Sequence, residues 1–376
     1  MLHCVYDLSQ VRQVDNKESY SRCSNNFCSI DTDHLPAPDI YGIELYEEVY
    51  INPKLESHVR SEIMSIIEEN YLKTENIPER QHTYEMKLNL TSNIPISYGP
   101  RRLSYADRVE VDTIIEGSLS AGVIRPSSSP YSFPIVLRTK KSGERRMCID
   151  YRPLNKITVR DSYPIPLIDD CLERVEGKKY FTVLDLKNGF HQVNMAPDSI
   201  PFTAFVTPGG QYEYVKMPFG LRNAPAVFQR FINMVLEPFI KDGSIVVYMD
   251  DVTLATNTLE EHFDLLGRVL RRLAEYRLEI KMKKCQFCFT EIELLGFTVS
   301  SKGIRPNDSH LEAIKSMPFP SDAKQMSKCL GLFSYLRRFV PCFPSISMPL
   351  RNSVKPGAKF ELDENCRSAF VTLRDK

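Results

Sequence analysis

Three aspartates in or beside short apolar runs constrain the fold of this chain more than any other feature. Asp185 lies inside the run Val183-Leu-Asp-Leu186, and Asp250-Asp251 follows the run from Ile245 to Met249. An ionised carboxylate in an apolar strand costs free energy unless it is paired or binds a cation. The fold must therefore supply a counter-charge to these side chains.

The residues around Asp250 predict a β-hairpin with carboxylates at its turn. Residues 245–248 and 252–256 are rich in β-forming side chains, and the acidic pair lies between them. If Asp185 joins this pair, three carboxylates repel one another, and two Mg²⁺ ions would relieve the repulsion and support in-line phosphoryl transfer. An Asp-Asp pair taken alone is more often a solvated turn, so the apolar run before it is what favours a metal site.

The net charge of zero is the sum of an acidic part and a basic part. Residues 1–90 contain 8 Lys or Arg and 16 Asp or Glu, whereas the remaining residues contain 40 and 32. The stretch 125–160 has nine bases and two acids, a pattern that attracts the phosphate backbone of a nucleic acid. A solvated basic face is the alternative. Neutral net charge therefore does not exclude a nucleic-acid partner.

Composition excludes several other classes of protein. A hydrophobic content of 42% with 10% aromatics excludes a largely disordered chain. No apolar run approaches the roughly 20 residues of a membrane span, and the first ten residues lack the pattern of a secretory signal. Ten scattered cysteines indicate reduced thiols in a cytoplasmic or nuclear setting. Cys285-Gln-Phe-Cys288 has no second pair at zinc spacing, so packing explains it better than metal binding.

Strands and helices mix without regular alternation, which predicts an α+β fold. Val109, Ile114, Ile115 and Leu119 predict an amphipathic helix over 105–121, ended by Gly122. The other predicted elements are helical spacing over 56–70, a strand at 179–186, a hairpin of 202–207 with 211–217, helices from Asn223 and over 260–278, and a strand at 292–300 paired with 302–304.

Seven short blocks occur in one order along the chain. They are Ile124 to Pro130, Arg146 to Lys156, Tyr180 to Val193, Met217 to Pro225, Tyr248-Met-Asp-Asp251, Leu294-Leu-Gly-Phe297 and Gly331 to Phe339. Together they resemble the blocks of reverse transcriptases, in particular those of gypsy-type LTR retrotransposon Pol polyproteins. The resemblance covers roughly residue 82 to the end, and seven ordered blocks are more specific than any single motif.

The resemblance implies a right-hand polymerase in which an antiparallel palm sheet is backed by helices. It implies an RNA-directed DNA polymerase, a nucleotidyltransferase that uses dNTPs to extend a DNA primer on an RNA or DNA template within a Pol polyprotein. The expected parts are an acidic, partly disordered leader or linker at 1–81, fingers at 82–159 and 194–218, palm at 160–193 and 219–300, and thumb with the start of the connection at 301–376, RNase H being absent.

The resemblance also assigns roles to individual residues. Asp185, Asp250 and Asp251 would be the catalytic carboxylates that bind two Mg²⁺ ions, with Mn²⁺ as the alternative. Phe190 would be a steric gate that excludes a 2′-hydroxyl, although a core phenylalanine is the other reading of it. The residues expected at the incoming dNTP are Lys140, Arg146, Phe190, Phe219 and Gly220, and those expected at the primer end are Leu295 and Gly296.

Two departures from the family pattern bear on these roles. Thr139 and Phe202 stand where relatives usually have lysine, so one phosphate contact is expected at Lys140 and a template or nucleotide contact is expected to be weaker. A catalytically silent nucleic-acid-binding relic or host gene fragment is the alternative function. An RNA-dependent RNA polymerase is disfavoured by Phe190. The expected location is the cytoplasm, in virus-like particles, or the nucleus, without a membrane partner.

Overall fold

The computed structural model describes residues 49–73, 84–139, 143, 145–355, 360 and 363–375, and every structural statement below concerns these residues. They form helices and several separate sheets, as the prediction of an α+β fold requires. None of the described helices is both long enough and apolar enough to span a membrane.

A four-stranded antiparallel sheet carries the predicted acidic site. Its strands, in spatial order, are β11 (Gln286–Phe289), β5 (Tyr180–Asp185), β10 (Asp251–Thr256) and β9 (Ile245–Tyr248). Leu184 and Val252 pack into one apolar core, and Phe181 and Ala255 pack into a second core on the opposite face. Both faces are therefore buried, since successive side chains of a strand point to opposite sides. The predicted hairpin and the strand predicted over 179–186 are both present.

Helices cover both faces of this sheet. The helices in contact with it are α5 (Ile168–Val175), α6 (Ala224–Val235), α7 (Glu237–Lys241) and α8 (Leu259–Glu275). Thr258 and Glu261 begin α8 with a capping box, in which each side chain bonds the backbone N–H of the other. The helix ends three residues before the predicted Leu278 because Arg277 adopts a φ of +53°, and the Leu278 N–H then bonds the Leu273 carbonyl in a Schellman motif.

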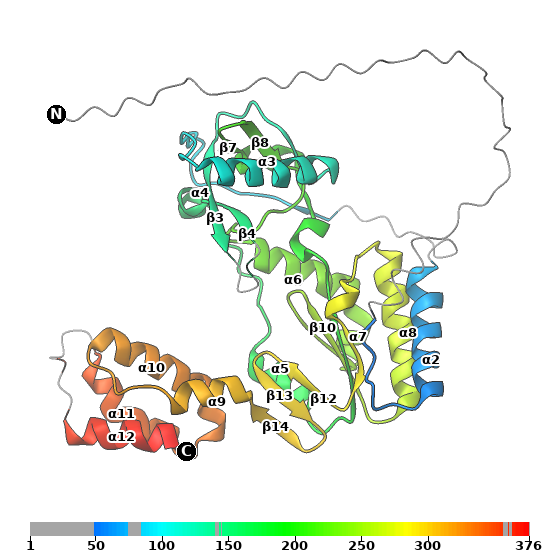
Figure 1. The fold of residues 1–376 in the computed structure, drawn as a ribbon, viewed down its shortest axis with the longest axis vertical. Coiled ribbons are helices and arrows are strands. Elements are labelled where there is room, and N and C mark those ends of the chain that lie inside the picture. The colour runs from blue at the N-terminus through cyan, green and yellow to red at the C-terminus, as the bar shows by residue number, and fades with distance from the viewer. Residues whose placement is uncertain are drawn as a thin grey trace, which may run out of the picture. The chain divides into compact units, whose positions relative to one another are not determined.

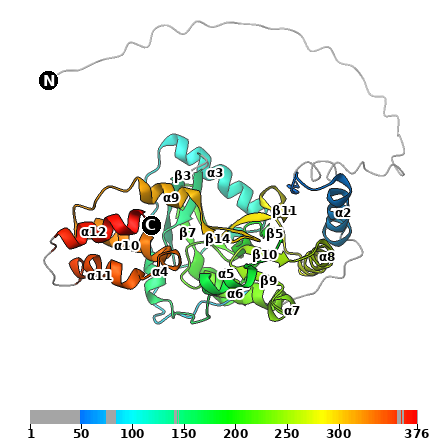
Figure 2. The same cartoon turned by 90° about the horizontal axis from the view of Figure 1, so that it is seen from below.

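The first described residues pack on the edge of the four-stranded sheet. Asn52 N donates to the Phe287 carbonyl at 3.1 Å, and Phe287 N donates to the Tyr50 carbonyl at 3.1 Å, so this segment pairs with the edge strand β11. Two helical segments continue it along α8, namely α2 (Ser57–Ile67) and the π-helical η1 (Glu68–Leu72). Figures 1 and 2 both show α2 beside α8. A paired edge is protected from pairing with other chains. This part of the segment predicted as a leader or linker is therefore packed against the sheet.

A second, five-stranded sheet holds part of the basic stretch, including Arg125, Arg138, Arg145 and Arg146. Its strands, in spatial order, are β2 (Ile124–Pro126), β8 (Gly210–Tyr214), β7 (Phe205–Thr207), β3 (Phe133–Thr139) and β4 (Arg145–Ile149). The β3–β7 pair is parallel, and the other pairs are antiparallel. The predicted hairpin of β7 with β8 is present, but β7 begins three residues later than predicted because residues 197–203 form the 3₁₀ helix η4 (Pro197–Thr203).

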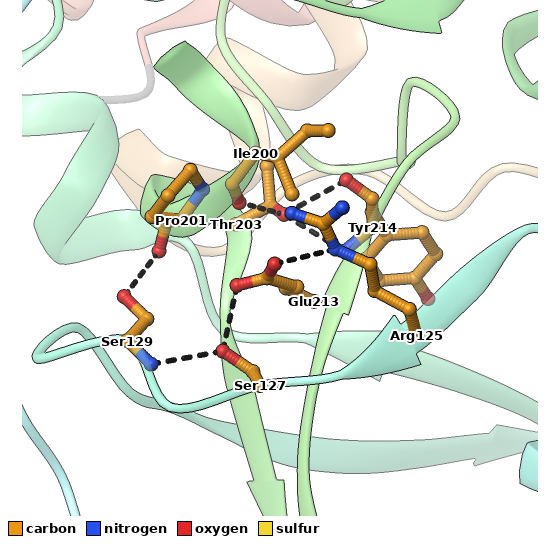
Figure 3. Close-up of polar contacts among 8 residues, drawn as sticks. All are labelled: Arg125, Ser127, Ser129, Ile200, Pro201, Thr203, Glu213 and Tyr214. Atoms are coloured by element: carbon orange, nitrogen blue, oxygen red, sulfur yellow. Dashed lines mark hydrogen bonds and ion pairs between the residues drawn. The ribbon is translucent and has the colours of Figure 1, made fainter. Parts of the chain in front are cut away.

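A buried carboxylate fastens this sheet to the segment before it (Figure 3). Glu213 on β8 accepts from Arg125 Nε at 2.8 Å and from Ser127 Oγ at 2.6 Å. Thr203, at the end of η4, accepts from Tyr214 N at 2.9 Å, and Ser129 Oγ donates to the Pro201 carbonyl at 2.7 Å. Because the buried charge of Glu213 is paired with Arg125 and hydrogen-bonded to Ser127, the cost of its burial is offset, and these bonds connect β2 and the segment after it to β8.

Helix α3 (Tyr105–Ser120) corrects one part of the sequence-based prediction. Ser104 caps it by accepting from Asp107 N at 3.1 Å, and Gly122 follows its end with a φ of +64°, as predicted. Its buried residues are Val111 and Ile115, which lie four positions apart on one face, whereas Val109 is 51% exposed. The prediction that Val109 faces the core is therefore wrong.

The part of the chain after β11 forms a three-stranded sheet and a group of helices. The sheet consists of β12 (Glu291–Leu294), β13 (Phe297–Ser300) and β14 (Gly303–Pro306), and the helices are α9 (Asp308–Lys315), α10 (Ala323–Tyr335), the 3₁₀ turn η6 (Arg337–Phe339), α11 (Phe343–Ser353) and α12 (Glu364–Asp375). Helices α10, α11 and α12 pack together in both views (Figures 1 and 2). The boundary predicted between residues 300 and 301 falls inside this sheet, since β13 pairs with β14.

The single strand predicted over 292–300 is wrong, because a tight turn divides it into β12 and β13. Leu295 and Gly296 connect the two strands with φ angles of +49° and +80°. Positive φ at both central residues is typical of a type I′ hairpin turn. The remaining described elements are β1 (Glu85–Met86), which pairs in parallel with β6 (Asn194–Met195), together with α4 (Arg152–Ile157), η3 (Gly189–Gln192) and η5 (Met282–Lys284).

The observed face of α3 predicts a contrast between two valine substitutions. Val111→Ala removes two buried methyl groups and should lower the free energy of unfolding by about 1–3 kcal/mol. Val109→Ala, on the exposed face of the same helix, should change it by less than about 0.5 kcal/mol. Urea unfolding of the two variants measures both values. Equal destabilisation would contradict the observed helix face.

Candidate active site

The register of the four-stranded sheet places two of the predicted carboxylates side by side. Asp251 on β10 lies directly opposite Asp185 on β5, and Tyr248 on β9 lies opposite Asp251 on its other side. Directly opposed residues on antiparallel strands project from the same face, with Cβ atoms about 4.5–5.5 Å apart. Like charges in this position destabilise the pair, so the sheet holds two carboxylates together against their repulsion.

A strained two-residue turn brings the third carboxylate to the same place. Met249 and Asp250 connect β9 to β10, and Met249 has a φ of +55°, the sign required at the first central position of a type II′ turn. Met249 N donates to Gln229 Oε1 at 2.8 Å, and Leu186 N donates to the Asp250 carbonyl at 3.1 Å. These bonds fix the strained turn between α6 and the end of β5.

Gly189 leaves the space that the Asp250 carboxylate occupies. A Cβ built on Gly189 would collide with Asp250 Oδ1 and would lie 2.9 Å from Phe228 Cζ. Asn188, just before it, has a φ of +47° and starts the 3₁₀ turn η3. Any larger residue at position 189 would therefore displace the Asp250 side chain from its place beside the end of β5.

Burial and mutual repulsion disfavour the ionised form of the turn carboxylate. Asp250 Oδ1 is buried and has no hydrogen-bond partner among the described residues. Loss of solvation, followed by the charges of Asp251 and Asp185, raises the pKa of Asp250 from 3.8 to about 6. Burial and then the charge of Asp185 also raise the pKa of Asp251. The cluster thus lacks the positive charge that would let all its carboxylates ionise.

Lys284 supplies part of that positive charge. Its Nζ lies 3.0 Å from Asp185 Oδ2. The lysine belongs to the short turn η5, and the next residue, the buried Cys285, accepts a hydrogen bond on Sγ from Asp185 N at 3.4 Å. Burial raises the pKa of the Cys285 thiol to about 12, so the thiol remains protonated and adds no further negative charge.

A cavity of about 780 Å³ connects the carboxylates to the five-stranded sheet. Four basic side chains, two acidic ones and three aromatic rings line much of it, and these are Arg145, Arg146, Lys281, Lys284, Asp185, Asp250, His191, Tyr214 and Phe219. A cavity lined by both basic side chains and carboxylates suits a polyphosphate that approaches bound cations.

Two of the predicted dNTP contacts, Arg146 and Phe219, line this cavity. The Arg146 guanidinium lies 4.0 Å from the centre of the Phe219 ring. The Phe190 ring lies behind, 5.0 Å from Phe219 and 5.6 Å from Phe228, and is 8% exposed. Phe190 thus supports the cavity wall through Phe219 and is not itself among the lining residues. Gly220, with a φ of +95°, follows in the same loop.

Other predicted residues are not brought to the cavity. Leu295 and Gly296 form the hairpin turn of the three-stranded sheet and do not line the cavity. Lys140 lies outside the described residues. Cys285 and Cys288 are both buried, and neither belongs to any cluster of metal-binding side chains in the described ranges.

Sequence reasoning missed several residues that build the site. His191 stacks on Tyr214 with a centroid distance of 6.0 Å, and both line the cavity. Asn155 fixes the Phe219 loop, since its Nδ2 donates to the Gly220 carbonyl and its Oδ1 accepts from Arg222 N, each at 2.8 Å. His191 and Asn155 lie inside the recognised blocks, so the blocks carried a signal for them.

The donor chemistry of the cluster fits divalent cations, although its geometry is not that of a closed metal site. Within the described residues, no three His, Cys, Asp or Glu side chains are arranged to hold one ion. Two observations nevertheless favour a cation. Asp250 Oδ1 has no hydrogen-bond partner among the described residues, and the pKa values of Asp250 and Asp251 are both raised. Carboxylate oxygens are the ligands that Mg²⁺ prefers.

Comparison with known proteins supports the family resemblance that the sequence blocks indicate. Residues 138–299 match the sequence model of the family described as reverse transcriptase (RNA-dependent DNA polymerase). The chain is 39% identical over 285 residues to the retrovirus-related Pol polyprotein from transposon 297 of Drosophila melanogaster, which covers 74% of this chain and 27% of that protein. It is 32% identical over 304 residues to the transposon Tf2-3 polyprotein of Schizosaccharomyces pombe, which covers 80% of this chain and 23% of that protein.

Solved structures define the class of fold. A foamy viral protease-reverse transcriptase in complex with dsDNA superposes with a TM-score of 0.75 at 24% identity, over 92% of this chain and 72% of that one. The foamy viral enzyme in complex with an RNA/DNA hybrid gives 0.70 at 23% identity, over 89% and 45%. The described residues therefore have the fold of a right-hand polymerase.

Sequence and fold together identify the family. The chain belongs to the reverse transcriptases, of the kind found in LTR retrotransposon Pol polyproteins. It spans about a quarter of the length of the curated relatives that it matches.

The raised pKa of Asp250 predicts that its charge destabilises the metal-free protein. Between pH 4 and 6 the unfolded chain has lost the Asp250 proton and the folded chain retains it, so rising pH lowers stability across this window. The shift corresponds to about 3 kcal/mol, which partial exposure reduces to about 1–2 kcal/mol. In EDTA at pH 7.5, Asp250→Asn should therefore unfold at a higher urea concentration than the wild type.

The same comparison at pH 4 serves as its control. At pH 4 the folded wild type keeps Asp250 protonated and a large part of the unfolded chains does so too, so the difference between Asp250→Asn and the wild type should shrink. A variant that is less stable than the wild type at pH 7.5 would contradict the raised pKa.

Proposed function

We propose that this chain is the polymerase part of a Pol polyprotein, an RNA-directed DNA polymerase that extends a DNA primer on an RNA or DNA template with dNTPs. The observation that carries the proposal is the cross-strand pairing of Asp185 with Asp251, beside Asp250 at the turn. Three carboxylates at one end of a sheet, two of which line a cavity that also holds four basic side chains, suit phosphoryl transfer with metal ions.

Asp185, Asp250 and Asp251 would hold two Mg²⁺ ions, or Mn²⁺ in their place. Bound there, the ions would activate the primer 3′-hydroxyl and stabilise the charge on the transferred phosphoryl group and the leaving pyrophosphate. The protein's own contribution is to hold the carboxylates together despite their repulsion, through the sheet register, the Met249 turn and the space at Gly189.

The basic and aromatic wall of the cavity would bind the incoming dNTP. Arg146 carries a fixed positive charge on the Phe219 ring, where it can pair with a triphosphate. Lys140, in the same hairpin of the sequence, is proposed to close over the phosphates. Phe190 is proposed to act on sugar selection through the position of Phe219, since it supports that ring from behind.

The larger assignments remain proposals of the same kind. The five-stranded sheet with α3 would be the fingers, the four-stranded sheet the palm, and the helices after β14 the thumb with the start of the connection. The proposed partners are a primer–template duplex, dNTPs and the remainder of a Pol polyprotein. The proposed location is the cytoplasm, in virus-like particles, or the nucleus. A silent nucleic-acid-binding relic is the alternative, and it predicts duplex binding without synthesis.

Primer extension tests the proposed function directly. With an RNA template, a DNA primer, dNTPs and Mg²⁺, the wild type should extend the primer, and Asp251→Asn should lower the rate at least about 100-fold because a cation ligand is lost. Asp264→Asn, an exposed carboxylate on α8, is the matched control and should extend normally. Binding of the duplex by the wild type without extension would favour the relic.

Sugar selection tests the proposed role of Phe190. Phe190→Val should raise the use of rNTPs relative to dNTPs at least about tenfold, because the smaller side chain lets Phe219 move away from the sugar. Phe231→Val, at a residue that is also buried but packs on Phe228 and not on Phe219, controls for loss of packing. An unchanged ratio of rGTP to dGTP incorporation in Phe190→Val would rule out this role.

A further inference from the structure

The hairpin turn between β12 and β13 is a strained segment that its own strands do not fully support. Leu295 has a φ of +49°, in the left-handed region that a branched side chain rarely adopts, and Gly296 follows at +80°. Such a conformation persists when surrounding contacts determine it. The contacts come from the helices that follow the sheet.

Tyr335, the last residue of α10, touches every residue of this turn region. Its hydroxyl donates a hydrogen bond to the Leu295 carbonyl, 40 residues away in sequence. Its ring stacks on Phe297 with a centroid distance of 4.8 Å and an interplanar angle of 23°. A Cβ on Gly296 would collide with the Tyr335 hydroxyl, so the hydroxyl lies directly against the glycine.

His310 on α9 packs against both Tyr335 and Gly296. Its ring lies perpendicular to Tyr335 with a centroid distance of 5.6 Å. The Cβ of a substituted Gly296 would lie 2.9 Å from His310 Cε1. The turn is thus enclosed by one residue from each of two helices, and glycine at position 296 is what allows both to approach.

Packing of the Tyr335 ring does not explain why the residue carries a hydroxyl. A phenylalanine would stack equally well on Phe297 and would fill the same space in the second apolar core. The hydroxyl adds a directional bond to the carbonyl at the tip of the turn, which fixes where Leu295 and Gly296 point.

We propose that Tyr335 is a positioning residue, through which helices α9 and α10 set the orientation of the Leu295–Gly296 turn against the primer strand. The inference rests on the proposed function and on the family resemblance, which implies that Leu295 and Gly296 lie at the primer end. It adds that helices α9 and α10 control the contact of this turn with the primer. A change at α10 should therefore alter primer binding without altering the nucleotide cavity.

The test replaces only the hydroxyl. Tyr335→Phe removes the bond to Leu295 and keeps the ring. Tyr84→Phe is the matched control, since Tyr84 also donates to a main-chain carbonyl, that of Val227 at 3.1 Å, and packs on a phenylalanine, Phe231, at 5.2 Å. The two variants lose the same kind of bond, so their thermal unfolding temperatures should fall by similar amounts.

Two measurements separate positioning from stability. The first is the dissociation constant of a fluorescent RNA/DNA primer–template, from anisotropy without dNTPs, and the second is the pair of KM values for primer–template and dNTP in extension. Tyr335→Phe should raise the dissociation constant and the primer–template KM about three- to tenfold, with the dNTP KM unchanged within about twofold. Tyr84→Phe should change none of them.

The outcomes distinguish the inference from the proposed function. If the wild type extends the primer and Tyr335→Phe behaves like Tyr84→Phe, the positioning role is wrong and the polymerase assignment stands. A rise in the dNTP KM of Tyr335→Phe equal to that for primer–template would also overturn it. If the wild type neither binds nor extends the duplex, the proposed function fails, and the inference fails with it.

Discussion

The structure depends on one unfavourable interaction, the repulsion between carboxylates that the sheet register places side by side. Asp185 and Asp251 are opposed on paired strands, and Asp250 reaches the same end of the sheet through a strained turn. Nothing in an apolar sheet requires acids there, and burial together with the charges of Asp251 and Asp185 raises the pKa of Asp250. Such an arrangement persists when binding of cations repays it, which is the physical reason for placing the chemistry of the protein here.

The rest of the molecule keeps these groups in place. Gln229 on α6 holds the Met249 turn, Gly189 leaves room for the Asp250 carboxylate, and Lys284 partly neutralises Asp185. The five-stranded sheet brings positive charge to the other wall of the cavity through Arg146. Beyond the cavity, the contact of Tyr335 with the Leu295 carbonyl links the helical part of the chain to the Leu295–Gly296 turn. Each contact joins residues far apart in sequence.

Because these contacts join residues far apart in sequence, only part of the fold and of the site could be predicted from the sequence. The hairpin around Asp250 and the strand of Asp185 were predictable because a short apolar run rich in β-forming residues is a local signal, and the family blocks located the acids and Arg146. The face of α3 was mispredicted at Val109 because its spacing from Ile115 does not match one helix face, and the turn at Leu295 was missed because an apolar run conceals it. Lys284 pairs with an acid 99 residues away, a contact that no local pattern contains. The 1–81 segment was read from composition alone, which does not reveal that residues 49–52 extend the sheet edge.

The central claim is that divalent cations complete the carboxylate cluster. Titration of Mn²⁺ into the protein with primer–template and dNTP, with the free ion followed by electron paramagnetic resonance, tests it most directly. The account predicts that the wild type binds Mn²⁺ and that Asp185→Asn, which removes one of the two opposed charges, loses most of this binding. Equal binding by the wild type and Asp185→Asn would contradict it.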